Sequence, residues 1–133
     1  MALLIDHLGI AVRSLDQAAP AWAAALGMGP AGREEVPGQG VRVAMFAVGG
    51  PKLELLEPMT PEGPVGKFLE SRGEGIHHIA FRVDDVNAAL ARAKDAGARM
   101  IDETPRRGAG GALVAFVHPK SLNGVLVEFV QRP

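Results

Sequence analysis

The chain has 133 residues, of which 47% are hydrophobic and 22% are charged, a balance typical of one folded domain and not of a disordered segment. A net charge of −1 argues against a broad nucleic-acid surface, although a local basic patch remains compatible with it. The absence of Cys excludes disulfide scaffolds, Cys-ligated zinc, iron–sulfur clusters and thiol catalysis. No apolar run approaches the roughly 20 residues of a membrane span, and no signal-peptide pattern precedes the first strand. We therefore expect a cytoplasmic protein with neither a nucleic-acid nor a membrane partner.

The sequence carries one pattern twice. Residues 5–12 (IDHLGIAV) resemble residues 76–83 (IHHIAFRV), and superposing His7 on His78 sets an offset of 71 residues. The same offset places residues 41–46 on residues 112–117. Two matches at one offset indicate an internal duplication.

The first copy covers about residues 4–58. After a strand over 4–12, Ser14 and Gln17 form a capping-box pattern, and apolar residues at helical spacing predict a helix that stops at Gly27. Three strands should follow, near residues 32–35, 40–48 and 52–57.

A linker helix is expected over about residues 60–73, beginning at Thr60-Pro61. The second copy covers about residues 76–131. It begins with a strand over 76–83, and the helix after this strand is capped by Asp84 or Asp85 and ends at Gly97. Its later strands are expected near residues 99–103, 112–118 and 124–131. We predict an α+β fold in which the two βαβββ copies pack into one domain over residues 1–133, because each is small for a core of its own.

Four polar residues interrupt the apolar strands at matching places of the two copies: His7, Glu54, His78 and Glu128. Each alone would be read as a structural or solvent-facing side chain. Together they suggest that a pseudo-twofold axis brings two imidazoles and two carboxylates to one divalent metal such as Mn, Fe, Co, Ni or Zn. Because strand side chains alternate, we expect Asp6 to point away from His7 and His77 away from His78.

A second polar feature is the basic, glycine-rich stretch over residues 106–111. It is either a flexible turn or a phosphate contact made by Arg106 and backbone N–H groups, with Lys120 on the neighbouring hairpin. For His118, at the head of that hairpin, we prefer a role in the loop or at the rim of the site.

These motifs resemble the vicinal oxygen chelate superfamily, and within it the methylmalonyl-CoA epimerase family, from Ile5 to about Gln131. The stretches that carry the resemblance are IDHLGIAV (5–12), QGV (39–41), KLELLEP (52–58), GIHHIAF (75–81), GAGG (108–111) and HPKS (118–121).

The resemblance implies a glyoxalase-like fold, with one cupped mixed sheet around a metal held by His7, Glu54, His78 and Glu128. It implies an isomerase of propionate metabolism that interconverts (2R)- and (2S)-methylmalonyl-CoA by removing and returning the C2 proton through a metal-stabilised enolate. Co²⁺ is the ion favoured by the resemblance, with Mn²⁺, Ni²⁺, Zn²⁺ or Fe²⁺ as alternatives. A homodimer is expected, and the acyl-CoA thioester would be bound by the following residues: Gln39, Arg106, Lys120 and Ser121.

One departure from the family affects the expected catalytic pair. Some epimerases carry Gln where this chain has Glu54, and an additional Glu where it has Val43. Val43 cannot transfer a proton, so we hypothesise that Glu54 and Glu128 act as the two bases, one on each face of C2.

Three other functions use related sites. A lactoylglutathione lyase has a similar ligand set, a ring-cleaving dioxygenase uses two His and one carboxylate, and a drug-sequestering protein of this fold binds its ligand without metal. The GAGG and HPKS stretches favour the CoA enzyme over the lyase. The second carboxylate argues against the dioxygenase, and the intact ligand set argues against the non-enzymatic binder.

Overall fold

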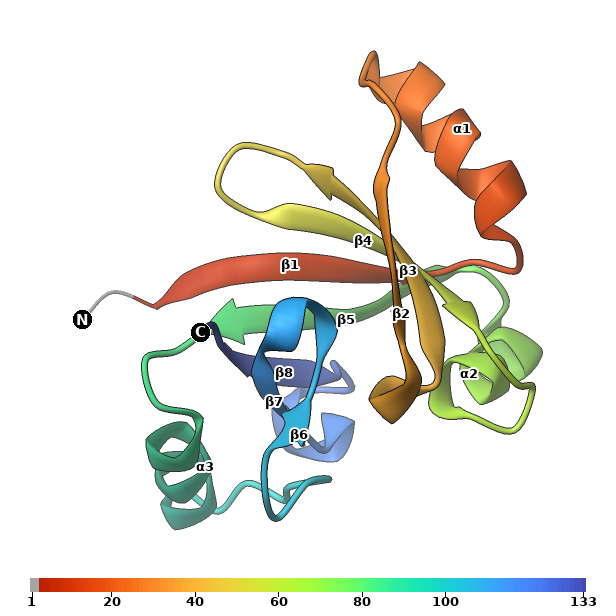
Figure 1. Cartoon of the computed structure of the whole chain (residues 1–133). Coiled ribbons are helices and arrows are strands. Elements are labelled where there is room, and N and C mark those ends of the chain that lie inside the picture. The colour runs from red at the N-terminus through yellow and green to blue at the C-terminus, as the bar shows by residue number, and fades with distance from the viewer. Residues whose placement is uncertain (1–2) are drawn as a thin grey trace. The chain divides into compact units, whose positions relative to one another are not determined.

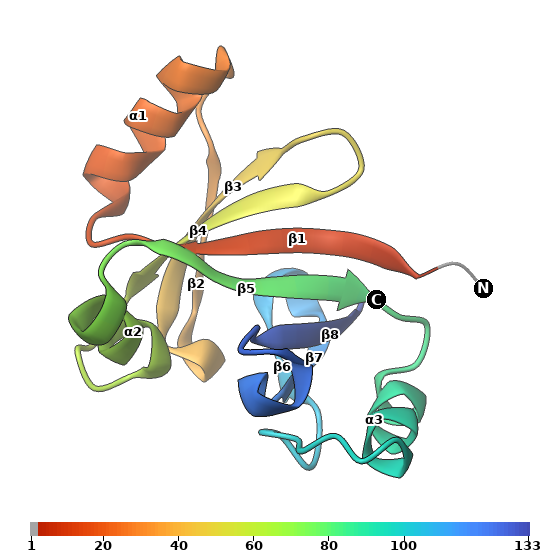
Figure 2. The same ribbon diagram turned by 180° about the vertical axis from the view of Figure 1, so that it is seen from behind.

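The computed structural model describes residues 3–133, which form eight strands and three α-helices (Figures 1 and 2). The α-helices are α1 (Leu15–Leu26), α2 (Pro64–Arg72) and α3 (Val86–Asp95). The strands are β1 (Leu4–Ala11), β2 (Gly32–Val36), β3 (Val41–Ala47), β4 (Lys52–Pro58), β5 (Gly75–Arg82), β6 (Arg106–Arg107), β7 (Leu113–Val117) and β8 (Val127–Gln131). Short 3-10 turns cover Pro37–Gln39, Ala109–Gly111 and Pro119–Leu122. The predicted α+β class is confirmed.

None of the helices within residues 3–133 is both long enough and apolar enough to cross a lipid bilayer.

The chain forms two compact units, and β1 and β5 each contribute residues to both. The N-terminal unit is Leu8–His77, and the C-terminal unit consists of residues 3–7 and 78–133. The division falls directly after His7 and directly before His78. Both histidines therefore belong to the C-terminal unit.

In the N-terminal unit the strand order is β2-β3-β4-β1, with β2, β3 and β4 paired antiparallel. Helix α1 lies against β3 and β4 (Figure 1). Its inward residues Leu15 and Ala19 join Ile10, Phe46 and Leu55 in one apolar core. Burying a side chain of the size of Leu55 stabilises the fold by about 1.5–3 kcal/mol.

The ends of α1 follow from local sequence. Ser14 has an extended backbone, and its hydroxyl accepts a hydrogen bond from the Gln17 N–H, as the capping pattern predicted. At the other end, Gly27 has φ 66°, a left-handed conformation that side chains with a Cβ disfavour. Pro20 lies within the helix.

In the C-terminal unit the order is β1-β5-β8-β7-β6. Strand β5 runs parallel to β8, whereas β8, β7 and β6 pair antiparallel. The carboxylate of Asp85 caps α3 by accepting hydrogen bonds from two backbone N–H groups, and Val86 and Leu90 of that helix pack against Ala115 of β7. Strand β8 lies in the middle of this order because it pairs with β5 on one side and β7 on the other.

Two predicted elements are displaced. The strand expected over residues 99–103 is reduced to a single bridge between Met100 and Val117. The Asp102 side chain accepts the Phe116 N–H at 2.8 Å, in place of a carbonyl of a continuing strand, and the edge strand forms later, at Arg106–Arg107. The linker helix begins at Pro64 and not at Thr60, because a proline at the first helical position needs no hydrogen-bond acceptor.

Candidate metal centre

Three neighbouring strands bring two histidines and a glutamate together. His7 lies on β1, His78 on β5 and Glu128 on β8, and Ala80 of β5 is in register with Glu128. The three residues are 4%, 5% and 2% exposed, respectively. Alternation along each strand points these side chains to a common face, as expected from the repeat.

The three donor atoms form a nearly equilateral triangle. His7 Nε2 lies 3.0 Å from His78 Nε2 and 3.1 Å from Glu128 Oε1, and His78 Nε2 lies 2.9 Å from the same oxygen. Donors that bind one divalent ion at about 2.1 Å lie about 3.0 Å apart at adjacent octahedral positions and about 3.4 Å apart in a tetrahedron. The donor set therefore fits a divalent metal with three adjacent ligands on one side.

The charge of Glu128 suits this role. Burial alone would raise its pKa, but hydrogen bonds with His7 and His78, together with their charge interactions, lower its pKa from 4.5 to about 2. Glu128 is therefore an anion at neutral pH, and imidazole with carboxylate is a ligand set for borderline or hard divalent ions.

The sequence-based orientation of Asp6 was wrong. Asp6 was expected to point away from His7, yet its Oδ2 lies 2.7 Å from His7 Nδ1, and its side chain is fully buried. Alternation fixes the direction of Cβ but does not prevent a short carboxylate from reaching the ring of the next residue. The signal available in sequence was an acidic residue directly before a candidate ligand on an otherwise apolar strand.

The pKa of Asp6 is also lowered, so its carboxyl group is an anion at neutral pH. Burial would raise its pKa, but the hydrogen bond with His7 and the hydrogen bonds and charge of Arg132 outweigh this effect and hold the pKa well below its usual range. Arg82 contributes a further hydrogen bond in the same direction.

The fourth predicted ligand, Glu54, belongs to the N-terminal unit. It lies on β4, is 3% exposed and is in register with Met45 of β3. Its neighbours Leu53 and Leu55 belong to the core beneath α1. Alternation therefore directs Glu54 to the opposite face of the strand from α1.

Arg106, one of the predicted substrate-binding residues, is linked to the donor triangle through an aromatic ring. Its Nε lies 2.9 Å from Asp102 Oδ1, and its guanidinium carbon is 5.6 Å from the centre of the Phe116 ring. The Phe116 ring in turn meets the His78 ring edge-on at 5.5 Å. One aromatic ring thus separates Arg106 from a candidate ligand.

The remaining candidates lie on two 3-10 turns. Lys120 is exposed, and the Ser121 hydroxyl accepts the Arg99 N–H at 2.8 Å. Gln39 is half-buried in the N-terminal unit. His118 caps the turn that carries Lys120, so its role is local and structural.

His77 packs away from the candidate ligands, as alternation predicted. Its ring meets that of Phe68 on α2 at 5.0 Å in an edge-to-face arrangement. This contact makes His77 a packing residue of the N-terminal unit.

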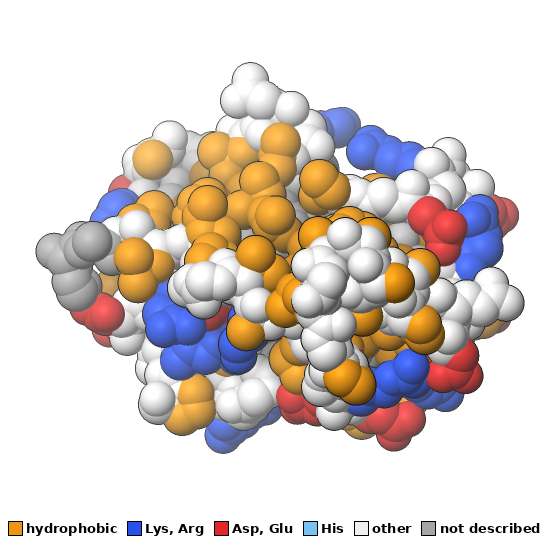
Figure 3. Space-filling model, turned by 90° about the horizontal axis from the view of Figure 1, so that it is seen from above, with side chains coloured by type: hydrophobic (Ala, Val, Ile, Leu, Met, Phe, Trp, Pro, Cys, Tyr) orange, Lys and Arg blue, Asp and Glu red, His pale blue; other side chains and the backbone are white. Residues whose placement is uncertain are grey.

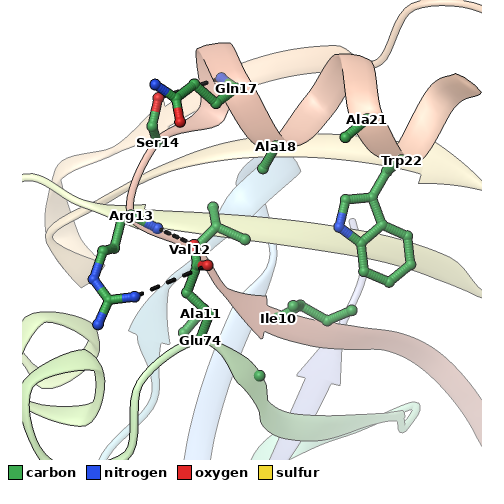
Figure 4. Close-up of a pocket in the computed structure, with 11 residues that line it drawn as sticks. Ile10, Ala11, Val12, Arg13, Ser14, Gln17, Ala18, Ala21, Trp22 and Glu74 are labelled. Carbon is green, nitrogen blue, oxygen red and sulfur yellow. Dashed lines mark hydrogen bonds and ion pairs between the residues drawn. The ribbon is translucent and has the colours of Figure 1, made fainter.

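A separate hollow of about 470 Å³ lies in the N-terminal unit at the start of α1 (Figure 4). The Arg13 N–H donates to Glu74 Oε2 at 2.9 Å across one side of it, and Trp22 lines an apolar side. The described residues that line it include none of the predicted ligands or substrate contacts. The hollow is therefore distinct from the candidate site.

Comparison with known proteins gives a consistent result. The family model described as Glyoxalase/Bleomycin resistance protein/Dioxygenase superfamily matches residues 6–116. An ethylmalonyl-CoA/methylmalonyl-CoA epimerase of Cereibacter sphaeroides is 40% identical over 96% of this chain and 96% of its own length. The mitochondrial methylmalonyl-CoA epimerase of Homo sapiens is 38% identical over 96% of this chain and 73% of its own length. A solved structure of Streptomyces coelicolor methylmalonyl-CoA epimerase, a variant in complex with 2-nitronate-propionyl-CoA, superposes with a TM-score of 0.93 at 41% identity, covering 98% of this chain and 99% of that one.

Proposed function

The chain belongs to the glyoxalase/bleomycin resistance protein/dioxygenase superfamily, and on this premise we propose that it is a metal-dependent epimerase that interconverts (2R)- and (2S)-methylmalonyl-CoA. The fold alone would not select this reaction, because it hosts many chemistries. The selection rests on relatives named as epimerases of this thioester at 38–40% identity over nearly the whole chain. The observation that carries the proposal is the triangle formed in this chain by the donor atoms of His7, His78 and Glu128.

We propose that His7, His78 and Glu128 hold a divalent ion, with Glu54 as the fourth ligand. The place of Glu54 in this set rests on its repeat-equivalent position and on the family resemblance, and it requires the two units to act as one domain. Co²⁺ is the ion we favour, with Mn²⁺, Ni²⁺, Zn²⁺ and Fe²⁺ as alternatives. The chemistry supplied by a bound ion is Lewis-acid stabilisation of negative charge on the thioester oxygen.

The proton transfers are assigned to two carboxylates. In one direction ionised Glu128 accepts the C2 proton, the C2–H electron pair delocalises toward the thioester carbonyl, and Glu54, protonated at the start, delivers its carboxyl proton to the opposite face of C2. The reverse direction exchanges the two roles, and no electrons are gained or lost overall. A carboxylate that also binds a divalent ion is a weaker base, so one of the two carboxylates would have to loosen from the ion during turnover.

Single substitutions test this pairing. Glu54→Gln and Glu128→Gln should each block C2 hydrogen exchange with solvent from one epimer while the other epimer still exchanges. Full epimerase activity of the Glu54→Gln variant with metal bound would show that the pairing is wrong.

The CoA portion is assigned to the basic residues near the donor triangle. Arg106 presents a guanidinium that is oriented by Asp102 and lies over the Phe116 ring, a geometry suited to a phosphate. Lys120 adds a second exposed cation, and Ser121 and Gln39 add neutral polar contacts. A few local cations are enough for CoA phosphates on a chain of net charge −1.

We propose that the enzyme is a homodimer. Three apolar residues are exposed here: Leu3, directly before β1, and Leu4 and Ile5, at its start, are 62%, 53% and 47% exposed. Figure 3 shows hydrophobic side chains exposed at the surface among charged ones. Large exposed apolar patches on a protein often mark sites of contact with another molecule. Light scattering after size exclusion should give twice the monomer mass, and a monomer would refute the proposal.

Location in the cytoplasm remains a prediction from the sequence.

Turnover on two thioester substrates tests the function. The enzyme should epimerise methylmalonyl-CoA, lose that activity to a chelator and regain it with Co²⁺. Turnover of the methylglyoxal–glutathione hemithioacetal, with methylmalonyl-CoA unchanged, would instead identify a lactoylglutathione lyase.

A further inference from the structure

A fully buried carboxylate lies directly behind one candidate ligand. Asp6 Oδ2 is 2.7 Å from His7 Nδ1, on the side of the ring opposite to the donor triangle. An ionised carboxylate only accepts hydrogen bonds, so this contact places a proton on Nδ1. The Nε2 atom of His7 then faces His78 and Glu128.

Two arginines hold Asp6 in this position. Arg132 donates from Nε to Oδ1 at 3.0 Å and from a terminal nitrogen to Oδ2 at 2.5 Å, a two-point fork. Arg82 donates from Nε and a terminal nitrogen to Oδ1 at 3.1 and 3.0 Å. The two cations more than balance the buried charge, and they fix the carboxylate in its plane.

Arg132 also reaches the glycine-rich turn. Its remaining terminal nitrogen donates to the Ala109 carbonyl at 2.9 Å. A Cβ on Gly110 would lie 3.1 Å from the same nitrogen, and Gly110 has φ +69°. The turn is therefore fitted closely around the guanidinium, and one side chain touches both this turn and the carboxylate behind His7.

We propose that Asp6, clamped by Arg82 and Arg132, is a positioning residue that fixes the His7 ring with Nε2 directed into the donor triangle, and that Arg132 ties the Ala109–Gly111 turn to this clamp. The inference rests on the proposed role of His7 as a ligand. Hydrogen-bond partners of ligating histidines set the ring orientation, and their loss typically weakens metal binding about 10–100-fold.

The experiment compares ring protonation and metal affinity. Nitrogen-15 NMR of the unmodified, metal-free protein should show His7 protonated at Nδ1. Titration calorimetry with Co²⁺ should give binding about 10–100-fold weaker for Asp6→Asn, and weaker to a smaller degree for Arg132→Lys, which keeps the charge but loses the fork. Glu57→Gln is the matched control, because Glu57 also pairs with an arginine, Arg42, at 2.9 Å in the other unit. It should bind Co²⁺ as the unmodified protein does.

The outcomes separate this inference from the proposed function. A His7 ring without a proton on Nδ1 in the unmodified protein, or unchanged Co²⁺ affinity in a folded Asp6→Asn variant, would overturn the clamp and leave the epimerase standing. If Asp6→Asn does not fold, the NMR result and the Arg132→Lys titration still decide. Failure of the unmodified protein to bind any divalent ion would overturn the metal-dependent function, whatever the state of His7.

Discussion

Replacing Glu128 with Gln should flatten the acid-unfolding profile of the metal-free protein. Burial of Glu128 opposes ionisation, but its contacts with His7 and His78 prevail and lower its pKa from 4.5 to about 2. This difference corresponds to about 3 kcal/mol of preference for the charged form. Because the folded-state pKa is the lower one, the stability is fully present above about pH 5 and is lost progressively as the pH falls toward about 2.

Urea unfolding of chelator-treated protein between about pH 6 and about pH 3 measures this effect. Over that range the unmodified protein should lose about 2 kcal/mol more unfolding free energy than Glu128→Gln. Glu62→Gln, at an exposed carboxylate, is the control and should follow the unmodified protein. Parallel profiles for Glu128→Gln and the unmodified protein would refute the assignment of Glu128 as a histidine-bound anion.

Other predictions follow from the geometry. Arg106→Gln should raise KM for methylmalonyl-CoA about tenfold with little change in kcat, because a phosphate contact stabilises the bound substrate and the transition state equally. Steady-state kinetics measure this effect, with Arg92→Gln as the control. A loss confined to kcat would count against the phosphate contact. Gly66→Ala should destabilise the fold by about 1–3 kcal/mol in urea unfolding, because its Cβ would lie 2.5 Å from the Pro61 carbonyl oxygen, whereas Gly32→Ala meets nothing within 4 Å and should be nearly neutral. Loading with Co²⁺ at about 100 times its dissociation constant should stabilise the protein by about 3 kcal/mol, seen as a higher Tm that a chelator reverses; an unchanged Tm would mean that the ion does not bind the folded state.

The internal repeat explains how much of the site was accessible from sequence. His7 and His78 share an offset that also aligns two pairs of strands, so their common place in the fold follows from duplication alone. The capping of α1 by Ser14 is a local property and was predictable for the same reason: its physics involves only neighbouring residues.

Long-range side-chain contacts were beyond the reach of the pattern. The clamp on Asp6 joins residues 76 and 126 positions apart in the chain, and strand alternation by itself places Asp6 and His7 on opposite faces. The loss of the strand near residues 99–103 has a similar cause, since Asp102 replaces a backbone acceptor with its own side chain. When a side chain replaces a backbone group as the hydrogen-bond acceptor, the spacing of apolar residues in the sequence does not change. The apolar pattern therefore gives no sign of the replacement.

The central claim is tested most directly by following the C2 proton of (2S)-methylmalonyl-CoA in deuterated water by NMR, with Co²⁺-loaded and chelator-treated enzyme. We predict that the loaded enzyme replaces this proton with deuterium while the (2R) epimer accumulates, and that the chelator stops both processes together. Retention of the C2 proton by loaded enzyme, or exchange that continues unchanged after the metal is removed, would contradict the proposed reaction and its dependence on the metal.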